Sequence, residues 1–223
     1  MQEGVRARKK RETRQAIIDA AIRLFGEKGF EATSIDELAR AAGIGKGTIY
    51  GYFRTKLEIF FAFCEEQIDY SFSAVSTTHN SDAPLLEQLH TLFFSQFRFI
   101  TANAEFGRQL VRELTFPSEA NRNLSRDLDR RYLKTVQDIL IAGKARGELH
   151  PDCDPLLATV HFYALYLLLI SGWYSGYSTT HEDQSQALRA LLQQALAGLG
   201  NGTLTQPLPP AVLEPIRALV ATP

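Results

Sequence analysis

The side chains best suited to specific polar contacts lie close together between Thr33 and Lys56. Within this stretch one lysine and three hydroxyl-bearing residues occupy every second position, namely Lys46, Thr48, Tyr50 and Tyr52. Hydroxyl and amino groups can hydrogen-bond the edges of nucleic-acid bases, and Lys and Tyr also reach phosphate oxygens. These residue types indicate nucleic-acid binding as the chemistry to consider first.

The glycines from Gly43 to Gly47 also invite comparison with phosphate-binding loops, but their spacing excludes two such loops. In a Walker loop a glycine would stand at Arg40, and Ser or Thr rather than Gly47 would follow Lys46. A dinucleotide-binding fingerprint would need glycine at Thr48 and a strand before the motif, where the pattern predicts a helix.

Two short helices and a glycine turn must position the polar side chains. Ser34 can cap a helix from Ile35 to Ala42, because Glu37 lies three residues later and can reach back to an open backbone N–H. Gly43-Ile44-Gly45 then breaks the chain, since glycine adopts turn conformations at little steric cost. The residues from Lys46 to Phe53 form the second helix, and the arrangement is typical of a helix-turn-helix.

The N-terminal quarter of the chain differs from the rest in charge. Residues 1–56 contain 12 Lys and Arg against 7 Asp and Glu, whereas residues 57–223 contain 12 against 18. A basic arm from Arg6 to Arg11, which we expect to be mobile, precedes a helix from about Glu12 to Lys28. A basic N-terminal region followed by an acidic remainder favours a polyanionic partner for the N-terminal region. The alternative is that the basic residues are only a solvated run of charge.

Cysteine content and hydropathy favour a soluble, cytoplasmic protein. Cys64 and Cys153 are far apart and belong to no metal-binding spacing, so we expect neither a disulfide framework nor a zinc site, and no cofactor. The basic N-terminus has no apolar segment typical of a signal peptide. The unbroken apolar run from Phe162 to Ile170 is nine residues, against about 20 for a membrane span, so we expect no membrane partner.

Helical periodicity continues to about residue 200 and predicts an all-α protein. Helices are expected over residues 56–76, 83–102, 104–115, 118–147, 155–177 and 184–199. We predict a helix-turn-helix domain with its basic arm over 1–55, a larger helical ligand-binding and dimerisation domain over 56–200, and a Pro-rich tail over 201–223 with at most a short helix. No flexible linker separates the first two domains, so movement in one can reach the other.

The motifs Thr33-Ser34-Ile35, Ile35-Asp36-Glu37-Leu38-Ala39 and Gly43-Ile44-Gly45-Lys46-Gly47-Thr48-Ile49-Tyr50, continued by Tyr52-Phe53 and Lys56, resemble the TetR family of bacterial transcription regulators. The resemblance is strong from about Arg11 to Phe60, roughly a quarter of the chain. It implies a homodimer that binds a palindromic operator in double-stranded DNA. A small molecule in the C-terminal domain would release the dimer from the operator.

The resemblance and the residue chemistry together give a set of expected DNA contacts: Thr33, Gly45, Lys46, Gly47, Thr48, Tyr50, Tyr52 and Lys56. Thr33 and Lys56 would bind backbone phosphates, whereas the Arg6–Arg11 arm either contacts DNA or only aids solubility. The family usually has Ser or Thr at Gly45, and Gly51 lies within the expected recognition helix, where it lacks a side chain to contact a base.

We expect the larger C-terminal domain to contain an effector pocket and a dimer interface. The stretch from Leu156 to Tyr174 is apolar on every face and must be covered all round. The resemblance implies a four-helix bundle across a two-fold axis, for which we expect Phe162, Leu165, Leu169, Leu188, Leu191, Leu192 and Leu196. It also implies a pocket for a hydrophobic or aromatic effector, for which we expect Phe94, Phe97, Arg98, Phe106, Tyr132, His161 and Tyr166.

Each of these body residues also has an ordinary structural explanation. Aromatic residues at helical spacing commonly form a core, and His161 could be a core histidine. Arg98 could bind a ligand carboxylate or extend to solvent. The segment from His150 to Asp154 is better explained as a helix-capping turn than as a metal site.

The sequence therefore predicts a ligand-responsive transcriptional repressor rather than an enzyme, since no catalytic constellation is evident. The alternative is an all-helical small-molecule binding protein or enzyme with a vestigial helix-turn-helix.

Overall fold

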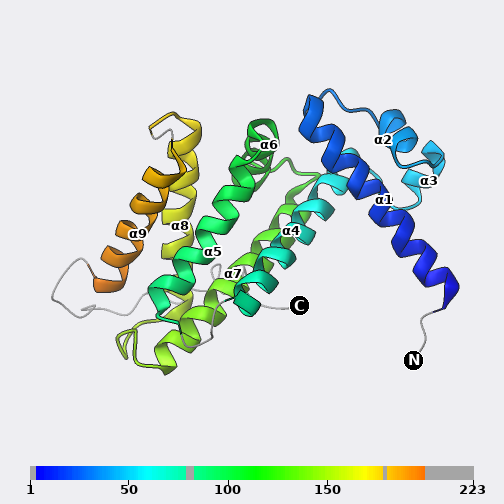
Figure 1. The fold of residues 1–223 in the computed structure, drawn as a ribbon. Helices are drawn as coiled ribbons and strands as arrows, with labels where there is room; N and C mark the ends of the chain where they lie inside the picture. The colour runs from blue at the N-terminus through cyan, green and yellow to red at the C-terminus, as the bar shows by residue number, and fades with distance from the viewer. Residues whose placement is uncertain (1–3, 79–82, 178–179, 199–223) are drawn as a thin grey trace. The chain divides into compact units, whose positions relative to one another are not determined.

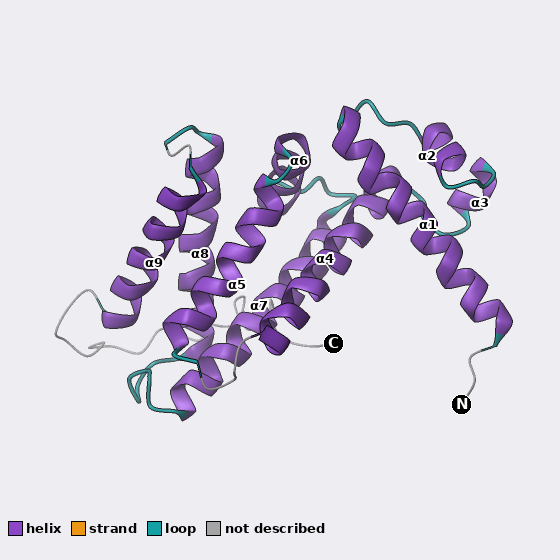
Figure 2. Cartoon of the chain, viewed as in Figure 1, coloured by secondary structure: helices purple, strands orange, loops and turns teal. Residues whose placement is uncertain are grey.

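The chain folds into α-helices throughout the part that its structure, a computed structural model, describes: residues 4–78, 83–177 and 180–198. No strand occurs among these residues (Figure 2), which confirms the all-α prediction. The helices are α1 (Val5–Lys28), α2 (Ile35–Ala41), α3 (Lys46–Tyr50), α4 (Lys56–Thr78), α5 (Leu85–Thr101), α6 (Ala104–Thr115), α7 (Arg122–Ala145), α8 (Pro155–Tyr174) and α9 (His181–Ala197) (Figure 1). The predicted tail lies outside the described residues.

Helix α1 begins earlier than the sequence pattern predicted. It starts at Val5 rather than near Glu12, so the segment from Arg6 to Arg11 is helical. Arg, Lys and Ala have high helix propensity, and the buried second half of α1 supplies an anchored helix that this segment extends. The predicted start of this helix near Glu12 was therefore wrong.

The chain divides into two compact units, Met1–Gln67 with Ile100–Ser125 and Ile68–Phe99 with Arg126–Pro223. Unit 1 thus contains α1, α2, α3, the first part of α4 and α6. Unit 2 contains most of α5 and α7 together with α8 and α9. The predicted division between residues 55 and 56 followed the sequence motif, whereas this division follows spatial contacts.

Phenylalanines form the centre of the unit 1 core. The Phe60 ring contacts the rings of Phe25, Phe30 and Phe106, with centroid separations of 6.3, 5.5 and 4.9 Å. From the helix-turn-helix, Leu38 and Ile49 are fully buried. Burying large apolar side chains drives the packing of these short helices, which would not be stable alone.

The helix-turn-helix itself has the capping predicted at its start. The Ser34 hydroxyl accepts from the Glu37 N–H at 3.3 Å, and the Ser34 N–H donates to Glu37 Oε2 at 2.9 Å, which confirms the capping box. Helix α3 is shorter than the predicted Lys46–Phe53. It ends at Tyr50, with Gly51 as its C-cap. Gly51 therefore closes the recognition helix rather than lying inside it.

Unit 2 joins α5, α7, α8 and α9 through aliphatic and aromatic packing. Helices α8 and α9 pack side by side (Figure 1), and a bidentate ion pair links Arg189 to Glu87 at 2.6 and 2.8 Å. Asp154 caps α8 by accepting from the N–H of Leu156 at 2.8 Å, as the sequence predicted for this turn.

Helix α8 is unusually apolar along its whole length. Among the described residues it is the one helix that meets the length and composition of a membrane span. A core helix of a soluble protein meets the same criterion, and six of its residues, including Phe162 and Tyr166, are buried within this chain.

Candidate nucleic-acid interface

Helix α3 presents its polar residues to solvent because one apolar residue anchors it. Ile49 is fully buried and Phe53, just beyond the helix, is 5% exposed. Lys46, Gly47, Thr48 and Tyr50 are exposed, with Tyr50 50% accessible, and Tyr52 is half-buried. The predicted base-contacting residues therefore lie on α3 or directly after it. Most of them are open to solvent, while Ile49 anchors the helix in the core.

Lys46 is already paired on this surface. Its Nζ donates to Asp36 Oδ2 of α2 at 2.8 Å, and this hydrogen bond raises the pKa of Lys46. Both side chains are about half exposed, so the pair is weak and open to competition. A phosphate oxygen approaching Lys46 would have to compete with the Asp36 carboxylate.

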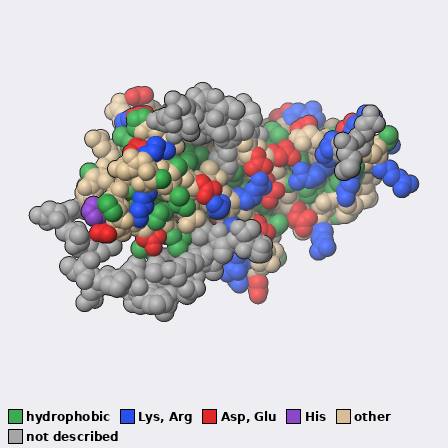
Figure 3. Space-filling view, turned by 90° about the horizontal axis from the view of Figure 1, so that it is seen from below, with side chains coloured by type: hydrophobic (Ala, Val, Ile, Leu, Met, Phe, Trp, Pro, Cys, Tyr) green, Lys and Arg blue, Asp and Glu red, His purple; other side chains and the backbone are tan. Residues whose placement is uncertain are grey.

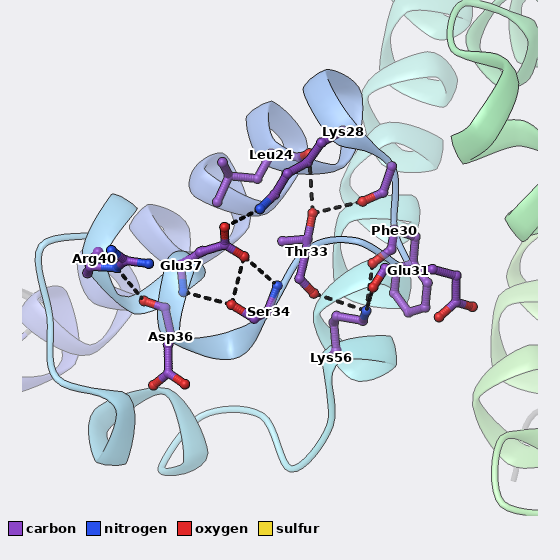
Figure 4. A network of polar contacts seen from close by, with 11 residues as sticks. Leu24, Lys28, Phe30, Glu31, Thr33, Ser34, Asp36, Glu37, Arg40 and Lys56 are labelled. Atoms are coloured by element: carbon purple, nitrogen blue, oxygen red, sulfur yellow. Dashed lines mark hydrogen bonds and ion pairs between the residues drawn. The ribbon is translucent and has the colours of Figure 1, made fainter.

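Thr33 and Lys56 have an internal structural role that the sequence motif did not reveal (Figure 4). The Thr33 side chain is 1% exposed, and its hydroxyl donates to the Gly29 carbonyl at 2.8 Å. Lys56 Nζ donates to the carbonyls of Phe30, Glu31 and Thr33 at 2.6, 3.3 and 3.0 Å.

The surroundings of Lys56 complete a clamp on the turn between α1 and α2. Its ammonium group lies 4.3 Å from the centroid of the Phe30 ring, and partial burial lowers its pKa. An ammonium has three N–H donors, and three carbonyls account for them. We name Thr33, Lys56 and the carbonyls of Gly29, Phe30, Glu31 and Thr33 the turn clamp. Phosphate contacts by Thr33 and Lys56 stay a prediction.

A charged network holds the start of α2 beside the end of α1. Glu37, which completes the capping box, also forms an ion pair with Lys28 (Figure 4). The hydrogen bond from Lys28, followed by those from Ser34, lowers the pKa of Glu37 to about 2. The carboxylate therefore stays ionised and keeps α2 oriented through the neutral and mildly acidic range.

The first half of α1 carries a run of exposed basic residues. The side chains from Arg6 to Arg11 are exposed, and an exposed ion pair joins Arg8 to Glu12 at 3.4 Å. In Figure 3 Lys and Arg side chains gather toward the α1 end of the molecule. At the N-cap of α3, Gly45 makes no side-chain hydrogen bond, as its residue type requires.

The predicted pocket residues do not form one group. Phe97 is fully buried in unit 2 against Trp173, and Phe94 stacks on it with a centroid separation of 5.9 Å. Arg98 and His161 are exposed. Phe106 lies in unit 1, where its ring packs on Phe60 and Phe63.

Tyr132 and Tyr166 lie in an aromatic cluster that contains polar groups. Their rings pack on Phe93, whose centroid is 5.0 Å from that of Tyr166 and 6.0 Å from that of Tyr132, and the Tyr163 ring packs on both tyrosines. We name these four residues the tyrosine cluster. The Tyr163 hydroxyl donates to Asp129 Oδ1 at 2.7 Å, while burial raises the pKa of Asp129 to about 6.

Among the buried polar atoms of unit 2 that lack a hydrogen-bond partner within the described residues, two lie on neutral side chains that are each only 3% exposed. They are the Tyr166 hydroxyl and the Gln96 amide nitrogen. Gln96 follows Phe93 by three residues on α5, so both side chains project from the same face of that helix. Leaving such a group unpaired costs about 1–3 kcal/mol, so these positions favour a bound polar group.

Burial separates the predicted dimer residues into two sets. Phe162, Leu169, Leu188 and Leu192 are buried in this chain alone, whereas Leu165, Leu191 and Leu196 are half-buried. The sequence pattern did not single out Leu168, which is 65% exposed on α8. A period-3.6 stripe cannot tell which apolar face meets the same chain and which meets a partner.

Comparison with known proteins agrees with this architecture. Residues 17–63 match the family described as bacterial regulatory proteins, tetR family, and residues 82–193 match the tetracyclin repressor-like C-terminal domain. The chain belongs to the TetR family. Its helix-turn-helix is thus the DNA-binding part of a bacterial transcription regulator, and the resemblance seen in the N-terminal motifs extends into unit 2.

Individual relatives cover most of this TetR-family chain. An uncharacterized HTH-type transcriptional regulator, YhgD of Bacillus subtilis (strain 168), is 26% identical over 72% of this chain and 83% of its own length. The fatty acid metabolism regulator protein of the same organism is 24% identical over 87% and 97%. The crystal structure of FadR from Bacillus subtilis in complex with stearoyl-CoA shares the fold, with a TM-score of 0.68 at 22% identity over 83% and 99%.

Proposed function

We propose that this protein is a cytoplasmic, ligand-responsive repressor that binds a palindromic operator as a homodimer and leaves it when an effector binds. The observation that carries the DNA-binding part is the α3 surface, where Thr48 and Tyr50 are exposed on a helix held by buried Ile49. Side chains of these types read base edges in the major groove. Family membership supports the same function.

A dimer follows from the geometry of DNA as well as from the family. Helix-turn-helix dimers place two recognition helices about 34–36 Å apart, on successive major-groove faces. A single α3 offers few base contacts, and two copies double them. The exposed apolar side of α8, around Leu168, supports this helix as part of the dimer contact, together with half-buried Leu165 and Leu191.

The effector is proposed to be largely apolar with at least one hydrogen-bonding group. The tyrosine cluster offers aromatic surface, and Gln96 and Tyr166 offer the two buried polar atoms described above. Both can donate hydrogen bonds, which suits a carbonyl or other acceptor on the effector. Two FadR structures of similar fold, from Bacillus subtilis and Thermus thermophilus, contain stearoyl-CoA and lauroyl-CoA, so long-chain acyl thioesters are the first compounds to test.

The experiment that tests DNA binding starts from a pool of random-sequence duplexes. The full-length protein should enrich palindromic sequences, and the affinity for a selected duplex should fall linearly on a log–log plot against salt concentration. If no sequence is enriched, or if the affinity does not depend on salt concentration, the results would favour the alternative of a small-molecule binding protein with a vestigial helix-turn-helix.

Tyr50→Ala tests the α3 surface directly. Because Tyr50 is half exposed, its removal should leave the fold and the dimer intact while weakening the selected duplex about ten-fold or more, since a good base contact is worth about 1–3 kcal/mol. Tyr177→Ala, which removes an 89% exposed tyrosine in unit 2, is the matched control and should bind DNA as the wild type does. Loss of the dimer in Tyr50→Ala by size-exclusion chromatography would show a structural role instead.

A further inference from the structure

Asn103 connects two helices of unit 1 with the two ends of one amide group. It is the N-cap residue of α6, where its Oδ1 accepts from the Phe106 N–H at 2.9 Å. Its Nδ2 donates to the carbonyl of Gly26 in the last turn of α1 at 3.0 Å. One planar side chain therefore fixes the beginning of α6 relative to the end of α1.

Both partners of Asn103 are backbone groups that a helix cannot satisfy internally. The first N–H groups and the last four carbonyls of an α-helix lack intrahelical partners. Helix α1 ends at Lys28, so the Gly26 carbonyl belongs to that last set, and the Phe106 N–H belongs to the first turn of α6. The bridge is thus directional at both ends and holds a single relative position of the two helices.

Two other contacts of α6 with this part of unit 1 are less restrictive. Arg112 meets Glu31 at 3.3 Å, but both side chains are more than half exposed, where such pairs contribute little. The Phe106 ring packs on Phe60 and Phe63, and apolar packing is not directional. Asn103 therefore supplies a directional contact between α6 and α1, with a hydrogen bond at each end of its amide.

The place of Asn103 in the chain gives this bridge a use. It follows α5 by two residues, and α5 contains Phe93 of the tyrosine cluster and Gln96. At its other end, the Gly26 carbonyl lies seven residues before Thr33 of the turn clamp and eight before the cap of α2. A displacement of α5 would be transmitted to Asn103 through the two peptide units between them. From Asn103 it would be transmitted to α1 through the hydrogen bond to the Gly26 carbonyl.

We propose that Asn103 is the positioning residue that ties α6 to α1 and so carries the state of α5 to the DNA-binding helices. This proposal rests on the proposed function, because it assumes that unit 2 and DNA influence each other. Asn103 itself contacts neither DNA nor effector. By reciprocity, a bridge that carries an effector's influence to DNA also carries the influence of DNA back to α5.

The variant Asn103→Ser separates the bridge from the cap. Serine is a good N-cap residue, so the Phe106 N–H keeps an acceptor, but the side chain is too short and has no amide to hold the Gly26 carbonyl. Glu31→Gln is the matched control, because it weakens the exposed pair with Arg112 and leaves the Asn103 bridge intact.

Hydrogen exchange of the full-length protein, free and bound to a selected duplex, provides two readouts. In the free protein, Asn103→Ser should speed exchange at residues 26–33 at least three-fold. On DNA binding, the wild type and Glu31→Gln should gain protection along residues 85–99, and Asn103→Ser should not. A merely structural loss of stability would speed exchange in all of unit 1 without abolishing this DNA-induced change.

Each outcome decides the proposal. Unchanged exchange at residues 26–33 in Asn103→Ser, or DNA-induced protection of α5 that persists in this variant, would overturn it. If the wild-type protein selects no duplex, the proposed function fails. The exchange of the free protein then still shows whether Asn103 holds α6 to α1, and absence of an effect there would overturn that tie as well.

Discussion

At the scale of single residues, the turn clamp changes how Lys56 should be understood. A lysine after a recognition helix invites the expectation of a phosphate contact, since charge and position are all that the sequence displays. The structure shows its ammonium group against three carbonyls and the Phe30 ring. Lys56 therefore affects the DNA-binding surface first through the shape of the turn between α1 and α2.

Lys56→Ala should destabilise the protein as well as weaken DNA binding. The carbonyls of the clamp lose a partly buried cationic donor, and we expect the free energy of unfolding to fall by about 1–2 kcal/mol. Denaturant titration followed by circular dichroism measures this. Unchanged stability with a lower salt dependence of DNA binding would mean that Lys56 acts only on phosphate. Exposed Arg54, mutated to Ala, is the control for loss of a nearby positive charge.

Asp36→Asn should strengthen DNA binding. The substitution removes the carboxylate that pairs with Lys46 and one negative charge from the DNA-binding surface. Because both side chains are exposed, the pair is weak, and the affinity for a selected duplex should rise about two- to five-fold at low salt, less at high salt. Fluorescence anisotropy with labelled duplex measures the change, and weaker binding would show that Asp36 positions Lys46 for its contact instead.

At the scale of elements, the start of α2 was predictable and the start of α1 was not. The Ser34–Glu37 capping box is a local signal, and local signals fix helix starts well. In α1 the buried residues lie between Ile17 and Phe25 and anchor the helix. The helix continues from there toward the N-terminus through basic residues of high helix propensity. The run of positive charge concealed that propensity, so the start of the helix was wrongly predicted near Glu12.

The capping network of α2 should give the protein a specific response to acid. The pKa of Glu37 is lowered from an ordinary 4.5 to about 2, so its stabilising effect is complete above about pH 4.5 and is lost as the pH falls toward 2. Thermal unfolding of Glu37→Gln should show a lower Tm than the wild type at pH 6, with the difference vanishing near pH 2. Exposed Glu119→Gln is the control, and a difference between Glu37→Gln and wild type that stays constant with pH would contradict the assignment.

At the scale of the whole molecule, the sequence predicted the helix order and fold class because the 3.6-residue period is long and regular. It did not predict the grouping of α6 with the DNA-binding helices, because this depends on contacts such as Asn103 with Gly26, 77 residues apart. The pocket prediction likewise placed Phe106 with unit 2 aromatics, since aromatic content alone does not show which core a residue joins.

The dimer can be tested on α8 without disturbing the fold of the subunit. Leu168 is 65% exposed, so Leu168→Glu should leave the subunit folded while placing two charges in the apolar contact between chains. We expect a monomer by analytical ultracentrifugation and at least about ten-fold weaker operator binding. Ile141→Glu, at a 48% exposed position on α7, is the control. A dimer that survives Leu168→Glu would exclude this side of α8 from the interface.

We propose that a small molecule and an operator compete for the same dimer through a shared conformational equilibrium. One titration tests it most directly: the affinity of the full-length protein for a selected palindromic duplex, measured at fixed salt with and without a saturating long-chain acyl thioester. We expect two chains per duplex and an affinity about 5- to 150-fold lower with the effector, in the range of usual allosteric couplings. Saturable binding of the thioester with no change in operator affinity would contradict it.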